Sequence, residues 1–368
     1  MVELVDAPDS KSGGSNTLRV RVSLRPPKDV QNFMNYKNVI MNLIIVFFSI
    51  IFALIIIELF LRINDQGPWG NLDNKRNDPT LNQPNIKLGW VPKKGKYIFD
   101  AFAPEGSKFE INILSDGSRK VPSLKKNIKE KNKIILLGGS VTLGWGVNDE
   151  QTFASQLQNK INSYEIKNFS AGGYGTYQSL LRLEDILETN DKIKIVVMSY
   201  LPHHSVRNIG SEFWLRTLTK YSKRGYVSLP YASINDKNEL IRKEPITYFK
   251  MPLMDQLSIA NKISKKIMQQ KLKNNEKKAD VVTNIIFENT QDLLENKNIR
   301  LIVLNLAEDK DALKPFIKNF KTKGIDFVNC NIKQTEELTI KGDGHPNSIM
   351  HTLYSECIYK NLKNFLDS

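Results

Sequence analysis

The sequence predicts an α/β fold, a doubly wound parallel sheet with helices on both faces, preceded by one N-terminal transmembrane helix. Three short apolar runs, at residues 134–137, 195–198 and 301–304, each follow charged residues. Such runs are typical of parallel strands that are buried on both faces. Helical patterns at 153–161 and 177–187 lie between the first two runs. This alternation of strands and helices predicts a doubly wound sheet.

The overall composition fits a globular protein with a substantial core. Of the 368 residues, 40% are apolar and 25% are charged. The net charge is +14, and residues 262–278 contain seven lysines. This basic stretch is compatible with contact to anionic lipid or cell-wall polymer, and equally with a solvated helix face. Because no recognised motif or aromatic-interleaved basic stripe accompanies the charge, no nucleic-acid partner is expected.

The chain has two cysteines, Cys330 and Cys357. Neither lies in a CxxC motif or a Cys/His cluster, so no metal site is expected, and no other cofactor is implied. One disulfide in an oxidising compartment and two buried thiols both remain open.

Residues 39–57 predict a membrane span. Asn42 and Ser49 are the only polar members of this nineteen-residue run, and about 20 apolar residues cross the hydrocarbon core. A cleavable signal peptide would need a small-x-small site after the run. Glu58 and the residues up to Arg62 offer no such site, so an uncleaved anchor is expected.

The flanking charges predict how the anchor is oriented. The N-terminal side carries five basic residues: Arg19, Arg21, Arg25, Lys28 and Lys37. The other side carries Arg62 and then Asp65. The positive-inside rule therefore favours a cytoplasmic N-terminus and an exported, periplasmic catalytic domain.

The chain is expected to fall into four parts. Residues 64–85 are rich in Asn, Asp, Pro and Gly without a hydrophobic period, which indicates a linker. Alternating runs at 97–99 and 109–113 indicate edge strands before the main domain. The predicted parts are a disordered tail at 1–37 (with 1–33 before a true start at Met34 or Met41), a transmembrane helix at 38–63, the linker at 64–85, and the main domain at 86–368 with a helical insertion at about 210–298.

A serine follows the first predicted buried strand, in the segment Gly138-Gly139-Ser140. A serine where a strand turns into a helix lies at the carboxyl edge of the sheet, where α/β proteins form their sites. The helix N-terminus supplies N–H groups and partial positive charge, which stabilise an oxyanion. A Gly-Ser turn with a helix cap is the alternative.

Two further segments carry residues that suit acyl transfer. Gly172, Gly173 and Gly175 lie before a helix and predict backbone N–H groups presented to a cavity, or else a flexible loop. Asp343 and His345 lie near the C-terminus. Histidine can take the proton of a serine hydroxyl, and a nearby carboxylate fixes the imidazole tautomer.

These three segments, in this order, resemble the SGNH/GDSL hydrolase family. Residues 88–92, 111–119 and 144–153 resemble motifs of its membrane-anchored branch, and the resemblance spans roughly 86–200 and 300–360. It implies a flavodoxin-like sheet and a serine esterase or O-acyltransferase that forms an acyl-enzyme on an envelope glycan or lipid ester. By the same resemblance Ser140 is the nucleophile, His345 the general base and Asp343 its orienting partner. Gly173 and the Ser140 backbone N–H become the oxyanion donors.

The chain departs from the family pattern at two positions. The Asp of Gly-Asp-Ser is absent before Ser140, which does not affect the nucleophile. The Asn that normally completes the oxyanion hole aligns with His203, to within one residue. His203 or His204 can donate to an oxyanion and Arg207 can hold a carboxylate or phosphate, or all three are structural.

The altered third segment leaves a second function open. Losing one oxyanion donor costs on the order of 10²–10³ in rate. The alternative function is therefore a catalytically weakened scaffold that acts as a binding or assembly protein at the membrane. His351, in the helix after His345, is expected to pack or cap there rather than to act in catalysis.

Overall fold

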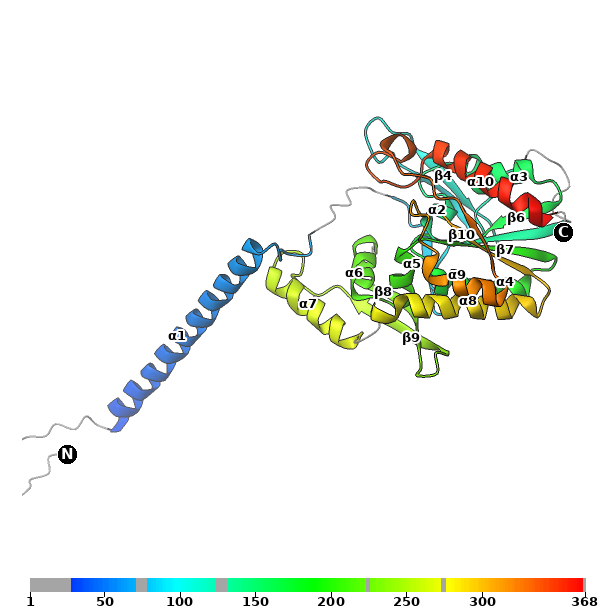
Figure 1. Ribbon diagram of the computed structural model, residues 1–368. Helices are drawn as coiled ribbons and strands as arrows, with labels where there is room; N and C mark the ends of the chain where they lie inside the picture. Colours follow the sequence, from blue (N-terminus) through cyan, green and yellow to red (C-terminus); the bar gives the residue numbers. More distant parts are fainter. Residues whose placement is uncertain (1–27, 71–77, 124–130, 223–225, 273–275, 367–368) are drawn as a thin grey trace, which may run out of the picture.

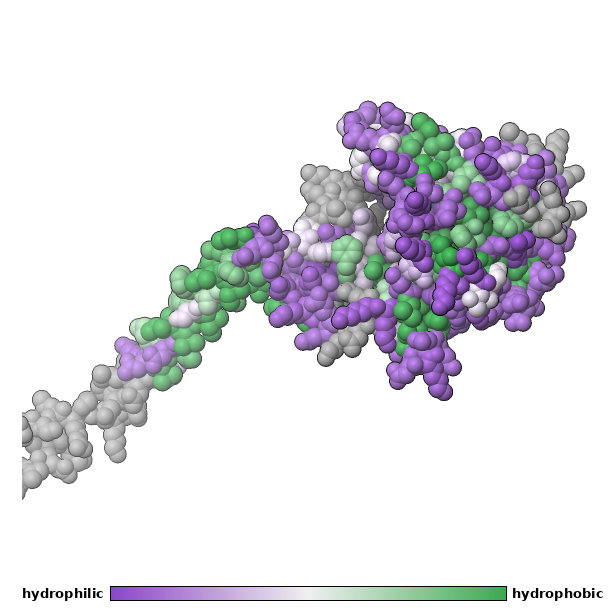
Figure 2. All heavy atoms as spheres, in the orientation of Figure 1, coloured by the Kyte–Doolittle hydropathy of each residue, from purple (hydrophilic) through white to green (hydrophobic). Residues whose placement is uncertain are grey.

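The computed structural model describes residues 28–70, 78–123, 131–222, 226–272 and 276–366. Helix α1 (Lys28–Ile63) projects away from the globular body (Figure 1). Its segment Tyr36–Ile63 is long and apolar enough to cross a membrane, and none of its most apolar window is buried against the rest of the chain. Figure 2 shows this helix as hydrophobic along most of its length, beside a largely hydrophilic body.

A five-stranded parallel sheet forms the centre of the body. Its strands, in chain order, are β5 (Asn132–Leu137), β6 (Tyr164–Asn168), β7 (Ile193–Tyr200), β10 (Arg300–Asn305) and β11 (Asp326–Asn329). Their spatial order is β11-β10-β7-β5-β6. This is the flavodoxin-like order, in which the chain switches direction between the first and third strands. The predicted doubly wound α/β fold is confirmed.

Helices cover both faces of this sheet (Figure 1). Along β7, Val196 and Met198 pack into one apolar cluster while Ile195 and Val197 pack into the other. This is the alternation that a strand imposes on its side chains. The first cluster is covered by α4 (Thr176–Thr189), α8 (Ala279–Glu295) and α9 (Lys314–Lys323), and the second by α3 (Phe153–Lys160) and α10 (Ser348–Leu366).

Two antiparallel hairpins precede the sheet. Strands β3 (Gly95–Phe99) and β4 (Phe109–Ile113) pair where alternating runs predicted edge strands. The other hairpin, β1 (Asn82–Asn85) with β2 (Gly89–Pro92), begins inside the segment predicted as a linker. The linker prediction also missed Trp69, whose ring lies 4.1 Å from both the Arg216 guanidinium and the Lys220 ammonium. Trp69 is therefore docked on α6, because cations bind an aromatic face.

The insertion at 210–298 is not wholly helical, so that part of the prediction was wrong. Its elements are α6 (Glu212–Tyr221), the hairpin β8 (Tyr226–Ile234) with β9 (Leu240–Phe249), α7 (Ser258–Lys271) and α8, and the short α5 (His203–Asn208) precedes it. The hairpin forms because Leu229 and Tyr248 reach an apolar cluster with Leu215 of α6. That long-range packing is not visible in local helix periodicity.

The predicted disordered tail also needs correction, because α1 begins at Lys28 and residues 28–37 are helical. Residues 1–27, which include most of the stretch expected to precede the true start and three of the flanking arginines, lie outside the described residues. The shorter helices of the body are α2 (Ser140–Leu143) and three 3-10 turns at Asp149–Gln151, Glu276–Lys278 and Glu336–Leu338.

A disulfide joins Cys330 to Cys357, which decides between the two states left open by the sequence. It links the segment that leaves β11 to helix α10, across 27 positions of sequence. Disulfides persist in oxidising compartments, which agrees with an exported domain.

His351 packs in the interface between α10 and α3, as expected. Its ring stacks on Phe153 at 5.7 Å, and its Nδ1 accepts a hydrogen bond from the Phe153 backbone N–H at 3.2 Å. The side chain is fully buried. Burial, with smaller contributions from Arg119 and His345, lowers the pKa of His351 to about 3.

This buried neutral histidine predicts an acid-sensitive fold. Between about pH 3 and 6.5 the unfolded state binds the extra proton, so stability falls as the pH falls. From pH 7.5 to 5 His351 should contribute a loss of about 2 kcal/mol. His351→Gln should reduce the measured drop in unfolding free energy by that amount, as followed by urea unfolding of the full chain in detergent. An identical drop in the variant would contradict the assignment.

Candidate active site

Ser140 lies at the switch point of the sheet. Strand β5 ends at Leu137, the chain turns at Gly138 and Gly139, and α2 begins at Ser140. A Cβ on Gly138 would lie 2.5 Å from Thr142 Oγ1 and 3.1 Å from Ser199 Cβ, so only glycine fits this turn. The serine therefore stands at the carboxyl edge between β5 and β7, the usual position of a ligand crevice in this topology.

The structure brings Ser140, His345 and Asp343 together. The Ser140 Oγ lies 2.8 Å from His345 Nε2, and His345 Nδ1 lies 2.5 Å from Asp343 Oδ2. These contacts suit an imidazole that donates from Nδ1 to the carboxylate and accepts the serine hydroxyl proton at Nε2. Ser140 and His345 are both partly exposed, so this pair is open to a substrate.

Short backbone bonds shape the loop that carries His345. The Ile340 N–H donates to the His345 carbonyl at 2.8 Å, and the Gly344 N–H donates to the Ile340 carbonyl at 2.8 Å. Thr339 and Pro346 form an isolated antiparallel bridge around the same loop. The loop therefore holds the imidazole in place before any substrate binds.

Gly173 lies in the loop after β6, with a φ of +83° that favours glycine. A Cβ there would lie 3.1 Å from the Trp90 ring and 3.4 Å from the Trp214 ring. The Trp90 indole N–H donates to the Gly172 carbonyl at 2.9 Å, which fixes the orientation of this loop. The glycine backbone is therefore held between two tryptophan rings.

The third segment lies in α5, directly after β7, on the other side of the switch point. His203 is exposed, while His204 is buried with its ring 5.0 Å from that of His203. A Cβ on Gly139 would lie 3.2 Å from His204 Nε2 and 3.4 Å from Arg207 Nη1. The structure thus places His204 and Arg207 beside the turn at Gly138 and Gly139, which precedes Ser140.

Electrostatics keep both histidines of α5 neutral. Burial, with smaller contributions from the neighbouring His203 and Arg207, lowers the pKa of His204 well below its usual value. Although His203 is exposed overall, partial desolvation followed by Arg207 and His345 lowers its pKa to about 3. Burial also lowers the pKa of Arg207 to about 9, which leaves it cationic at neutral pH.

Arg207 is anchored by two neighbours. Its guanidinium lies 4.0 Å from the centre of the Trp214 ring, and its Nη1 donates to the Tyr174 carbonyl at 3.0 Å. Neither ring nitrogen of His204 makes a hydrogen bond to the described residues. These side chains form one wall next to Ser140, and Trp214 is a member that the sequence did not reveal.

A buried arginine that sequence reasoning missed fixes the segment after Ser140. Arg119 pairs with Asp149 at 2.8 Å and is almost fully buried. Its other N–H groups donate to the carbonyls of Leu143, Gly144 and Val147 at 2.9, 2.5 and 2.7 Å. Arg119 was visible only as part of a motif resemblance, because nothing local shows that its guanidinium donates to several carbonyls of the segment after Ser140.

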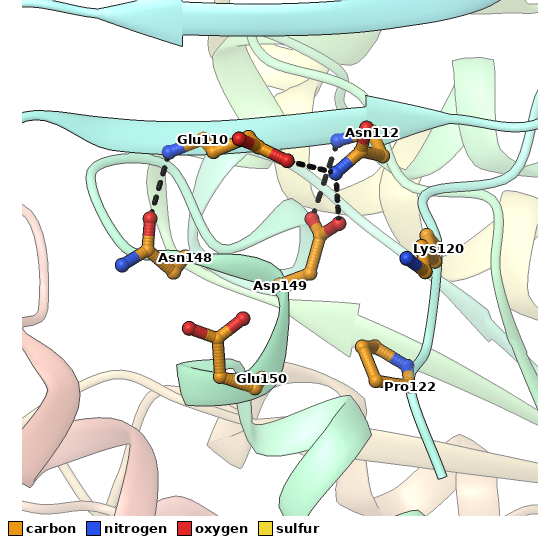
Figure 3. Close-up of a pocket in the computed structure, with 7 residues that line it drawn as sticks. All are labelled: Glu110, Asn112, Lys120, Pro122, Asn148, Asp149 and Glu150. Carbon is orange, nitrogen blue, oxygen red and sulfur yellow. Dashed lines mark hydrogen bonds between the residues drawn. The ribbon is translucent and has the colours of Figure 1, made fainter.

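A polar pocket lies beside the Arg119–Asp149 ion pair (Figure 3). Asn112 donates through Nδ2 to Asp149 Oδ2 and to Glu110 Oε1, both at 2.8 Å. The pocket is lined by Glu110, Asn112, Lys120, Pro122, Asn148, Asp149 and Glu150. None of these residues is Ser140, Asp343 or His345. The pocket lies where the β3–β4 hairpin meets the segment after Ser140.

The contacts among Ser140, His345 and Asp343 suit a serine nucleophile with a histidine base. Within the described ranges, no group of three His, Cys, Asp or Glu side chains is placed to hold a metal ion.

Comparison with solved structures finds similar folds at low identity. TesA has a TM-score of 0.38 and 12% identity, covering 63% of this chain and 99% of that one. Est24, a carbohydrate acetylesterase from Sinorhizobium meliloti, has a TM-score of 0.38 and 9% identity, covering 64% and 100%. The inhibitor-bound aryl esterase of M. smegmatis has a TM-score of 0.38 and 8% identity, covering 63% and 99%. No protein-family model and no curated protein matches the chain.

The buried Arg119–Asp149 ion pair predicts that replacing Arg119 lowers the stability of the fold strongly. Arg119→Met should destabilise the fold by about 3–5 kcal/mol, because it leaves the Asp149 carboxylate buried without its cation. Arg242→Met is the matched control, since its ion pair with Glu184 is half exposed and worth at most about 1 kcal/mol. Urea unfolding of the full chain in detergent measures both. Equal losses would show that Arg119 does not brace the nucleophile segment.

Proposed function

We propose that this chain is a membrane-anchored serine esterase or O-acyltransferase that works through an acyl-enzyme on Ser140. The observation that carries the proposal is the continuous contact from Ser140 Oγ through His345 to Asp343, at 2.8 and 2.5 Å. A serine hydroxyl becomes a nucleophile when a positioned base takes its proton. This arrangement, at the switch point of an α/β sheet, is what acyl transfer requires.

The first half-reaction forms the acyl-enzyme. Ser140 Oγ attacks the ester carbonyl carbon while His345 Nε2 takes the hydroxyl proton, and Asp343 stabilises the resulting imidazolium. The carbonyl oxygen becomes an oxyanion, for which the backbone N–H groups of Ser140 and Gly173 are the proposed donors. When the tetrahedral intermediate collapses, the C–O bond to the alcohol breaks and the alcohol leaves with the proton from His345.

The second half-reaction releases the acyl group. His345 takes a proton from a water molecule or from an acceptor hydroxyl, whose oxygen attacks the Ser140 ester. The proton then returns to Ser140 as the ester bond breaks. With water the product is a free acid, and with a sugar hydroxyl the product is a new ester. The choice between hydrolysis and transfer depends on which acceptor reaches the carbonyl first.

The third oxyanion donor is assigned to His203 rather than His204. His203 is exposed at the start of α5, directly after β7, and Arg207 and His345 both contribute to its lowered pKa. His204 is buried against the ring of Tyr200, 6.0 Å away, which suits a structural role. A neutral imidazole still carries one N–H, so His203 can replace the missing amide donor. Arg207 remains a candidate for holding an anionic group of the substrate.

The anchor favours substrates at the cell envelope. Helix α1 contains a long apolar span, most of the flanking basic residues precede that span, and the body contains a disulfide. Together these features support a single-pass protein whose catalytic domain faces the periplasm. An ester-bearing glycan or lipid at the membrane surface is therefore the proposed substrate class.

The proposal predicts that esterase activity depends on Ser140. Ser140→Ala should lower kcat/KM of the detergent-solubilised full chain on p-nitrophenyl acetate by on the order of 10⁴–10⁶-fold. His345→Ala should fall to a similar level, and the double variant should lose little more because the two residues act as a unit. Ser163→Ala is the matched control, since this exposed serine lies just before β6 and should leave the rate unchanged.

If the wild type and Ser140→Ala release nitrophenol equally slowly, the proposed esterase activity is refuted. That result would favour the second function, a binding or assembly protein on a weakened scaffold. The specific observation behind this second function is the missing asparagine at the His203 position.

A further inference from the structure

Helix α7 begins where the apolar run of α1 ends. Glu58 of α1 accepts hydrogen bonds from the backbone N–H groups of Ser258 and Ile259 at 2.9 and 3.0 Å. Arg62, one turn further along α1, donates to the Gln256 carbonyl at 2.8 Å. A carboxylate on the first N–H groups of a helix complements its dipole, so the N-terminus of α7 is fixed to α1 at this level.

The direction of α7 determines its orientation relative to a membrane. Figure 1 shows α7 running across the line of α1 rather than continuing it. With α1 across the bilayer, the bond to Glu58 places α7 beside the point where the apolar segment leaves the hydrocarbon. Helix α7 then lies along the membrane surface instead of pointing away from it.

The two sides of α7 differ as an interfacial helix requires. Ser264 and Met268 are buried, and Met268 belongs to the apolar cluster under α6 and the β8–β9 hairpin. Ile263 and Ile267, one turn apart on another side, are 45% and 42% exposed. Leu257, just before the helix, is also exposed. A soluble surface gains nothing from this row, whereas an interface buries it.

The charge of α7 matches an anionic surface. Lys265, Lys266 and Lys271 are exposed, and residues 258–271 contain no Asp or Glu. Long lysine side chains keep their ammonium groups at the headgroup level while the apolar stems lie deeper. Lysines beside the membrane attract anionic lipid over a Debye length.

Helix α7 is also joined to the wall of the active site. The Arg216 side chain of α6 hydrogen-bonds Asn261 of α7 and pairs with Glu212. Two residues before Arg216, Trp214 stacks on Arg207 beside the nucleophile turn. A contact between α7 and lipid would therefore fix the orientation of the Ser140 site relative to the membrane.

We infer that α7 is a lipid-binding helix that lies in the membrane interface, with Ile263 and Ile267 among the acyl chains and its lysines on anionic headgroups. This inference rests on the proposed membrane anchor. It adds a second contact with the bilayer, which positions the Ser140 site over substrates at the membrane surface.

Nitroxide scanning of the full chain in nanodiscs tests the inference. The native cysteines are paired, so a single added cysteine can be labelled. The test sites are Ile263→Cys and Ile267→Cys. Ile98→Cys is the water control, on another exposed isoleucine in β3, and Phe52→Cys is the lipid control in α1. Collision rates with oxygen and with a water-soluble nickel complex separate the two environments.

In nanodiscs with phosphatidylglycerol, labels at 263 and 267 should show several-fold more oxygen and less nickel contact than the label at 98. Replacing Lys265, Lys266 and Lys271 by Gln, or using phosphatidylcholine alone, should move them toward the value at 98. Water-like values at 263 and 267 with a lipid value at 52 would overturn the α7 contact and leave the anchor standing. A water-like value at 52 would overturn both, and no dependence on lipid charge would overturn the headgroup contact.

Discussion

The hydrogen bond between Ser140 and His345 is the interaction on which the site depends. It joins residues 205 positions apart at 2.8 Å, so it exists only because the sheet and α10 bring the two loops together. Ser140 is fixed by the turn after β5, and His345 by a loop that leads into α10. The packing of α10 on α3 and the disulfide to the segment after β11 hold that second loop against the first.

Polar groups buried around this bond make the site rigid. Arg119 donates hydrogen bonds to three carbonyls of the segment after Ser140 and pairs with Asp149. Without Arg119 these buried groups would lack a hydrogen-bond partner. On the other side, burial keeps His204 neutral beside the cation of Arg207. The turn before Ser140 is therefore held between the satisfied Arg119–Asp149 ion pair and the wall formed by neutral His204 and cationic Arg207, and His345 Nε2 faces the Ser140 hydroxyl.

Sequence reasoning reached the parts of this protein that are encoded locally. The apolar runs predicted three strands of the sheet, β5, β7 and β10. Strand β11 was missed because its four residues carry only a short pattern. The β8–β9 hairpin and the docking of Trp69 depend on contacts made after folding, so no local signal reveals them. Arg119 and Trp214 belong to the same class, since their roles come from neighbours distant in sequence.

Labelling of the full chain with a fluorophosphonate probe tests the central claim most directly, because only an activated serine reacts rapidly. The account predicts one phosphonyl group per chain, located on the Ser140 peptide by mass spectrometry. Labelling should be lost in His345→Ala, although that variant keeps the hydroxyl. A wild-type protein that reacts no faster than His345→Ala, or that carries the label on another residue, would contradict the account.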